Sequence, residues 1–230
     1  MLLHAINAGF AHLPLLGFQR ILFQADLAEV VLVAGVVALW NSRRVGALEN
    51  DALRRRVVLT MAAFIPTYAI SRILQHLGHR PRPIGSVSLV PLADPNSWSA
   101  LQRGLGHWGS FPSDHAGLLT IAAVIAFSLA WRLGLIVTAF GTYVCLYRVA
   151  FGFHWPSDIL AGVLIGTLVA CAALLSEPLL IKRFDRVLAA FGDHPATANT
   201  LAVIFLGEFA MGFARLARLL SELGHGRLFH

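Results

Sequence analysis

Charged residues are scarce in this chain. Asp, Glu, Lys and Arg make up 13% of its 230 residues and apolar residues 57%, with a mean hydropathy of +0.70. Soluble globular proteins carry about 25% charged residues, so the chain lacks the polar surface that water requires. We therefore predict an all-α integral membrane protein, and the length fits one compact domain without a second sizeable one.

Cysteines and metal-ligand clusters are also sparse. The two cysteines, Cys145 and Cys171, lie inside apolar runs and are expected to be packing residues. No set of cysteines, histidines or carboxylates has the spacing of a metal site, so we expect neither a metal nor another cofactor. The first lysine or arginine is Arg20, so the basic start of a cleavable signal peptide is not evident.

The positive charge that is present gathers beside apolar runs. Arginines and a lysine cluster within 43–56 and 182–186, and the formal net charge is +6. The positive-inside rule assigns such segments to the cytoplasmic side, where they also meet anionic headgroups. No basic stripe with interleaved aromatic residues is present, so nucleic acid is not an expected partner.

Five apolar runs approach the length that a hydrocarbon core of about 30 Å requires. Pro66 is expected to kink the second, Arg132 to mark a tight turn after the third, and Pro156 to open the fifth helix. Asp26 and Glu29 of the first are expected to face the bundle or the interface. The predicted spans are about 21–40, 57–77, 114–131, 134–151 and 156–175.

The remaining segments flank this core. We predict that residues 1–20 form an interfacial segment, that 21–180 form the transmembrane domain, and that 181–230 form a cytoplasmic or interfacial helical tail. Within the tail, 200–214 is either a sixth span or an interfacial helix. The charge rule favours the interfacial helix, because the arginines that follow then stay cytoplasmic.

Counting spans predicts which polar segments share a side of the membrane. If 42–56 is cytoplasmic, then 78–111 and 148–158 lie outside, and 112–115 begins the third span on that side. Trp98 and Trp108 are expected to anchor the first of these segments at the interface. All the polar motifs therefore fall on one extracytoplasmic face, which predicts a single composite site.

The first motif, Pro112-Ser113-Asp114-His115, opens the third span. Ser113 suits an N-cap, and Asp114 suits the first turn of a helix. A helix N-terminus presents free N–H groups to phosphate oxygens, and His115 beside it could protonate a leaving oxygen. Ordinary capping with an interfacial histidine is an equally good explanation of this motif alone.

The second motif comprises Arg148, His154 and Asp158. A carboxylate near one ring nitrogen makes the other nitrogen a better nucleophile, and a guanidinium matches phosphoryl oxygens. A structural His–Asp pair is the alternative, but polar residues at membrane-helix ends that combine these three types favour chemistry. The third motif, Gln75 with Arg80-Pro81-Arg82-Pro83, adds positive charge on stiff backbone, for which headgroup binding is the alternative role.

Together these motifs resemble the type 2 phosphatidic acid phosphatase superfamily, which shares its site design with vanadium haloperoxidases. The family pattern is Lys, six residues, Arg-Pro; then Pro-Ser-Gly-His; then Ser-Arg, five residues, His, three residues, Asp. The resemblance spans about residues 57–175. The Pro-Ser-Asp-His variant is similar to the bacterial undecaprenyl-diphosphate phosphatase branch.

Three positions depart from the pattern. Gln75 stands in place of lysine, Asp114 in place of glycine, and Tyr147 in place of serine. A glutamine still donates hydrogen bonds, and Arg72, one turn earlier, or Arg80 could supply the missing charge. The backbone N–H at Asp114 stays usable, and the Tyr147 phenol could replace the lost hydroxyl.

The resemblance implies a bundle of five or six transmembrane helices and a two-step phosphatase that needs no metal. His154 would attack phosphorus with Asp158 orienting it, while His115 would protonate the leaving oxygen and then activate water. The residues that would hold the phosphate oxygens are Arg82, Arg148, Ser113, Asp114 through its N–H, and Gln75, with Arg72 and Arg80 as further candidates.

The implied substrate is a lipid phosphate or diphosphate, first of all undecaprenyl diphosphate, at the extracytoplasmic face of the bacterial inner membrane. The alternatives are a lipid phosphotransferase that uses the same histidine and a phosphatidate or phosphatidylglycerophosphate phosphatase. A non-catalytic lipid-phosphate binder or transport component is less favoured, and a haloperoxidase is disfavoured because those enzymes are soluble. The sequence leaves headgroup, lipid tail and homo-oligomerisation open.

Overall fold

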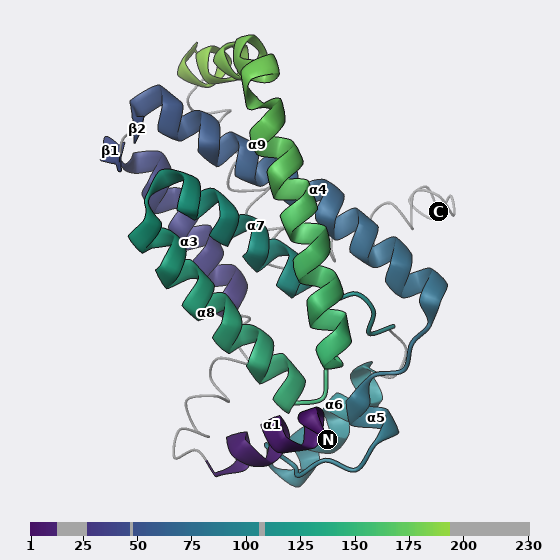
Figure 1. Ribbon diagram of the computed structural model, residues 1–230. Helices are drawn as coiled ribbons and strands as arrows, with labels where there is room; N and C mark the ends of the chain where they lie inside the picture. The colour runs from purple at the N-terminus through teal and green to yellow at the C-terminus, as the bar shows by residue number, and fades with distance from the viewer. Residues whose placement is uncertain (13–26, 47, 106–108, 194–230) are drawn as a thin grey trace, which may run out of the picture.

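A computed structural model describes residues 1–12, 27–46, 48–105 and 109–193, which form a helical bundle with one small hairpin (Figure 1). Within these described ranges, three segments are long and apolar enough to cross a membrane: Asp51–Ser86, Trp131–Ala150 and Pro156–Ala190. The predicted helical membrane fold is confirmed.

The arginine-rich segment is a hairpin and a helix start rather than a loop. After α3 (Leu27–Asn41), strands β1 (Arg44–Val45) and β2 (Leu48–Glu49) pair antiparallel. The long helix α4 (Asn50–Gly78) then begins seven residues before the predicted span at 57. Asp51 in its first turn favours this early start, because negative charge stabilises a helix N-terminus.

Helix α7 (Asp114–Leu129) lies at the centre of the bundle, against α4, α8 (Trp131–Ala150) and α9 (Pro156–Asp193). Its side chains Leu118, Ile121 and Ile125 are buried together with Phe64 of α4. A helix of 16 residues is about 24 Å long, shorter than the ~30 Å hydrocarbon core. Helices α4, α8 and α9 pack around α7, and the polar residues at its N-terminus, Ser113 and Asp114, are buried.

Glycines let α7 and α9 approach closely. A Cβ on Gly166 would overlap the backbone of Gly117, and a Cβ on Gly162 would overlap the carbonyl oxygen of Ser113. Gly162 and Gly166 are four residues apart, a spacing of small residues typical of close helix contacts in membranes. This contact brings the N-terminal ends of the two helices together.

The turn between the third and fourth predicted spans was placed wrongly at Arg132. Helix α7 ends at Leu129 and α8 begins at Trp131, so the extended residue Ala130 joins them (φ −157°, ψ 132°). Arg132 lies inside the first turn of α8. The reversal needs only one non-helical residue, which the apolar pattern does not mark.

Helix α9 begins at Pro156, as predicted, because proline has no N–H to lose at the first helical position. It continues through Pro178 to Asp193, past the predicted end at 175. Two ion pairs hold its far part against α4: Arg55 with Asp185 (2.7 Å) and Arg56 with Glu177 (2.8 Å). These pairs explain why the polar stretch after 175 stays helical.

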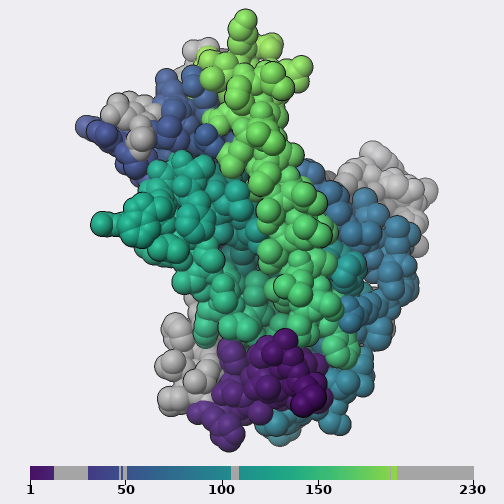
Figure 2. Space-filling view, viewed as in Figure 1, coloured from purple at the N-terminus to yellow at the C-terminus, as the bar shows by residue number. Residues whose placement is uncertain are grey.

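The two ends of the bundle differ. The hairpin and the C-terminal part of α9 lie at one end (Figure 1). At the other end, α1 (Leu2–Ala11) lies beside α5 (Pro83–Ser86) and α6 (Pro95–Leu105), and Figure 2 shows α1 seated against the ends of its neighbours.

Helix α1 is fastened to this end by a buried asparagine. Asn7 is 1% exposed and donates to the carbonyl oxygens of Val90 (3.0 Å) and Ala150 (2.9 Å). Its own carbonyl accepts from the Val90 N–H (2.9 Å). The predicted interfacial segment therefore docks on protein, at least over α1.

Trp98 is a core residue and not the predicted interface anchor. It is 7% exposed and its ring lies 6.3 Å from that of Phe151, in a cluster that includes Phe10 and Phe153. Helix α6 folds back over the segment that follows α8, so its aromatic side chain meets other aromatic rings. Trp108, Asp26, the side chain of Glu29 and the 200–214 segment lie outside the described residues.

Candidate active site

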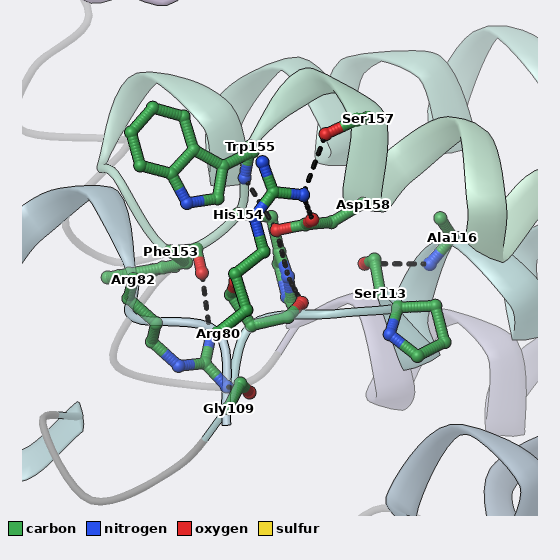
Figure 3. A network of polar contacts seen from close by, with 12 residues as sticks. Arg80, Arg82, Gly109, Ser113, Ala116, Phe153, His154, Trp155, Ser157 and Asp158 are labelled. Atoms are coloured by element: carbon green, nitrogen blue, oxygen red, sulfur yellow. Dashed lines mark hydrogen bonds and ion pairs between the residues drawn. The ribbon is translucent and has the colours of Figure 1, made fainter. Parts of the chain in front are cut away.

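Three chain segments converge at the α1 end of the bundle. They are residues 79–83 after α4, residues 109–115 leading into α7, and residues 148–158 joining α8 to α9 (Figure 3). The N–H of Ser113 donates to the carbonyl of Asp158 (3.0 Å), which links the second segment to the third. The structure thus brings the predicted motifs into one site.

His154 lies buried between these segments, with 1% of its surface exposed. Its Nδ1 is 2.8 Å from the carbonyl oxygen of Ser110. A carbonyl only accepts hydrogen bonds, so Nδ1 carries the proton and Nε2 keeps the lone pair. Burial, with the positive charges of Arg82 and Arg148, lowers the pKa of the imidazole to about 3.

Asp158 lies beside the His154 ring but contacts other groups more closely. Its Oδ2 is 3.9 Å from His154 Nδ1, beyond hydrogen-bond distance, and accepts from the Trp155 N–H at 2.8 Å. Its Oδ1 is 2.6 Å from Nη1 of Arg80. The carboxylate therefore influences the ring through its charge, while Ser110 supplies the hydrogen bond.

Arg80 is held at the edge of the site rather than inside it. Its Nη1 also donates to the Ser157 hydroxyl (2.9 Å), and its guanidinium lies over the Trp155 ring, 5.3 Å from the centroid (Figure 3). The Trp155 indole N–H donates to the Pro81 carbonyl (2.9 Å). These contacts make Arg80 a partner of Asp158.

Arg82 and Arg148 place positive charge around His154. Arg82 donates to the carbonyl oxygens of Phe153 (2.9 Å) and Gly109 (3.2 Å), which fixes its guanidinium between two of the segments (Figure 3). Arg148 lies in the last turn of α8 and is close enough to act electrostatically on both His154 and Arg82. Both positions suit the binding of phosphoryl oxygens.

Ser113 forms the predicted N-cap of α7. Its hydroxyl accepts from the Ala116 N–H (3.4 Å), and the residue is fully buried. The positive dipole end of α7 therefore lies at the site, where the backbone N–H groups of His115 and Ala116 donate to the side chains of Asp114 and Ser113.

His115 and Asp114 form a second imidazole–carboxylate pair. Asp114 Oδ1 lies 2.9 Å from His115 Nδ1, and Asp114 Oδ2 lies 3.1 Å from Arg72 Nη2. Arg72, a candidate replacement for the family lysine, is thus directed at Asp114.

Gln75 and Tyr147 both contact other protein groups in this structure. Gln75 is 2% exposed, and its amide donates to the Pro112 carbonyl (2.8 Å) while its oxygen accepts from Arg72 (3.3 Å). Tyr147 is 7% exposed and its ring lies 4.5 Å from that of Phe151. The expected phosphate contacts of Gln75 and Tyr147 stay predictions.

Sequence reasoning missed several groups that shape the site. The carbonyl of Ser110 sets the His154 tautomer, and the Trp155 ring supports Arg80. Backbone acceptors leave no signal in a sequence. The aromatic residue next to His154 was visible in the motif but had no assigned role.

Comparison with known proteins supports the family resemblance. The PAP2 superfamily model matches residues 56–182. YbjG of Escherichia coli (strain K12), a candidate undecaprenyl-diphosphatase by its name, is 30% identical over 79% of this chain and 84% of its own length. The bacitracin transport permease protein BcrC of Bacillus licheniformis is 25% identical over 69% of this chain and 70% of its own.

A further relative is the lipid A 1-diphosphate synthase of Escherichia coli (strain K12), 28% identical over 82% of this chain and 88% of its own length. No solved structure matches. The family match covers more than half of the chain, on the helices that carry the three motifs. The chain therefore belongs to the PAP2 superfamily of phosphatases.

Proposed function

We propose that this membrane protein hydrolyses a lipid diphosphate, first of all undecaprenyl diphosphate, through a phosphohistidine at the extracytoplasmic face. The observation that carries the proposal is the state of His154. It is buried and neutral, and its Nδ1 proton is directed at Ser110, so its Nε2 carries the lone pair that would attack. Arg82 and Arg148 place positive charge near it. The relatives' names favour a diphosphate substrate.

In the first step Nε2 of His154 attacks the terminal phosphorus. The N–P bond forms as the bond from the terminal phosphorus to the bridging oxygen breaks. That oxygen leaves as part of the lipid monophosphate, and His115 gives it a proton. Arg82, Arg148 and the backbone N–H of Asp114 stabilise the charge on the equatorial oxygens. Each such preorganised donor is worth roughly 3–4 kcal/mol in comparable sites.

In the second step water attacks the phosphohistidine. His115, now neutral, takes a proton from the water, the N–P bond breaks, and inorganic phosphate leaves. The Asp158 charge near Nδ1 stabilises the positively charged phosphorylated ring that the first step forms and the second step returns to neutral imidazole. The arginines supply the positive charge, so we expect activity to persist in EDTA.

The test is phosphate release by the detergent-solubilised protein. Wild type is expected to release phosphate from undecaprenyl diphosphate faster than from phosphatidate, phosphatidylglycerophosphate or lipid A. His154→Ala is expected to abolish release, since no other group takes the role of nucleophile. His4→Ala, an exposed histidine on α1, is the matched control and should keep full activity. Undiminished turnover in His154→Ala would falsify the mechanism.

A phosphotransferase is the second candidate, favoured by the similarity to a lipid A 1-diphosphate synthase. It would use the same phosphohistidine and pass the phosphoryl group to a lipid acceptor instead of water. Phosphate release measured with and without lipid A as acceptor separates the two. With a substrate labelled in its terminal phosphate, a phosphatase releases the same amount of phosphate with and without lipid A. A transferase instead places the labelled phosphoryl group on lipid A.

A further inference from the structure

Asp114, which replaces the family glycine, is the centre of a connected set of side chains. Its Oδ1 accepts from the backbone N–H of His115 (2.9 Å) and faces the ring Nδ1 of the same residue (2.9 Å). Its Oδ2 forms an ion pair with Arg72 (3.1 Å). The Asp114 side chain is 7% exposed and that of His115 is 17% exposed. A sheltered carboxylate therefore faces one nitrogen of the histidine assigned to proton transfer.

The set continues from α7 into α4. Arg72 lies over the Tyr68 ring (4.7 Å) and donates to the Gln75 oxygen (3.3 Å), and the Gln75 amide donates to the Pro112 carbonyl (2.8 Å). A glutamine can accept from Arg72 and donate to Pro112 at the same time. A lysine has no acceptor and would place a second positive charge beside Arg72. The two departures from the family pattern, at positions 75 and 114, thus belong to one arrangement.

We propose that Asp114 is a positioning residue for His115, held in place by Arg72 and Gln75. The inference rests on the proposed function, because it gives His115 the role of proton donor. The carboxylate orients the ring with Nδ1–H directed at itself, so Nε2 carries the proton that the leaving oxygen receives. After the transfer, the same orientation presents the Nε2 lone pair to water.

Charged and titratable groups lie near this pair. Arg72 of α4 acts on Asp114, and Arg82 lies within range of Asp114 as well. His154 of the α8–α9 connection is a titratable neighbour that stays neutral near pH 7. Arg148 acts on Arg82 and His154. Asp114 is the negative charge in direct contact with His115, so its removal should lower the pH at which the acid loses its proton.

The experiment compares wild type, Asp114→Asn, His115→Ala and the double variant on undecaprenyl diphosphate. Asparagine keeps the size of aspartate and removes its charge. Asp114→Asn is expected to lower kcat by about 10- to 100-fold, within the roughly 100- to 10,000-fold that general acid catalysis is worth. The alkaline limb of its pH–rate profile should move to lower pH by about one unit.

The double variant separates positioning from general damage. If Asp114 acts through His115, then Asp114→Asn should reduce kcat by less than about twofold in the His115→Ala background. Glu177→Gln, which breaks the ion pair with Arg56 far from the site, is the matched control and should leave the pH profile unmoved. The melting temperature and kcat of Glu177→Gln together show how much activity is lost through reduced stability alone.

Two results would overturn the inference: an unmoved alkaline limb in Asp114→Asn, or the same fold-loss with and without His115. Either would leave the proposed function standing, provided wild type releases phosphate and His154→Ala does not. Absence of phosphate release from wild type would instead count against the proposed function.

Discussion

Burial of His154 acts in opposite directions on chemistry and on stability. The buried imidazole stays neutral far below its usual pKa of 6.5, which keeps the Nε2 lone pair available for the attack that we propose. The same burial means that the folded protein cannot take up a proton that the unfolded chain binds readily. An active-site residue of this kind is expected to weaken the fold in acid.

We expect this conflict to appear as a pH-dependent loss of stability. Between pH 6.5 and about 3 the unfolded His154 binds a proton while the folded one does not, so stability falls as pH drops through this range. The largest slope that one such group can give is about 1.4 kcal/mol per pH unit. In His154→Asn that contribution disappears, because an amide does not titrate.

The measurement is the melting temperature in detergent between pH 7 and 4.5. Wild type should lose more of its melting temperature on acidification than His154→Asn. Parallel curves for the two proteins would show that His154 is not buried in its neutral form.

At the scale of elements, the contact between α7 and α9 positions the site. Gly162 lies against the Ser113 carbonyl, and the Ser113 N–H reaches the carbonyl of Asp158 at the start of α9. The helix that carries His115 and the helix that follows His154 are therefore aligned by backbone contact. Any side chain at the crossing would separate them.

We expect Gly162→Ala to reduce both stability and activity. The added methyl would overlap the Ser113 carbonyl and come 2.9 Å from the Ala116 Cβ, so the helices must move apart. Overpacking of this kind costs roughly 1–3 kcal/mol. Melting temperature and kcat should fall together, since Ser113 and His115 shift with α7.

Gly35→Ala on α3 is the control, because a Cβ there meets nothing within 4 Å. It should leave activity unchanged and stabilise the helix by up to about 1 kcal/mol, through the higher helix propensity of alanine. Equal losses from both alanine substitutions would contradict the role given to the crossing.

At the scale of the whole molecule, the bundle has a site end and a basic end. The site end holds the three motifs together with α1, α5 and α6, and the basic end holds the hairpin and the arginines of α4 that pair with α9. The positive-inside rule predicts an orientation in which the site lies away from the cytoplasm. This orientation suits a lipid diphosphate presented at the outer leaflet.

Cysteine labelling tests that orientation. In a background with Cys145→Ala and Cys171→Ala, a membrane-impermeant maleimide should label Ser88→Cys in intact cells. It should label Arg43→Cys, an exposed position next to the hairpin at the basic end, only after the membrane is made permeable. The reverse pattern would place the site in the cytoplasm and exclude the proposed outer-leaflet substrate.

The spans and the motif residues followed from local properties of the chain. Apolar runs, proline at a helix start and the Ser113 cap depend on neighbours within a few residues, so the limits of α7, the end of α4 and the start of α9 were predicted closely. The early start of α4, the turn at Ala130 and the long end of α9 were missed. Those limits depend on a first-turn charge, on a single extended residue and on ion pairs with another helix.

The sequence by itself determined which residues meet at the site, because motif spacing on helices of known direction brings their ends together. Only the tertiary structure decided what each residue contacts there. The Ser110 carbonyl and His154 are 44 residues apart, Gln75 and Pro112 are 37 apart, and Arg80 and Asp158 are 78 apart. Such partners are chosen by the packing of helices on one another, and a backbone carbonyl leaves no mark in a sequence. For that reason the Asp114–His115 pair, and the glutamine that supports it, became visible only in the folded protein.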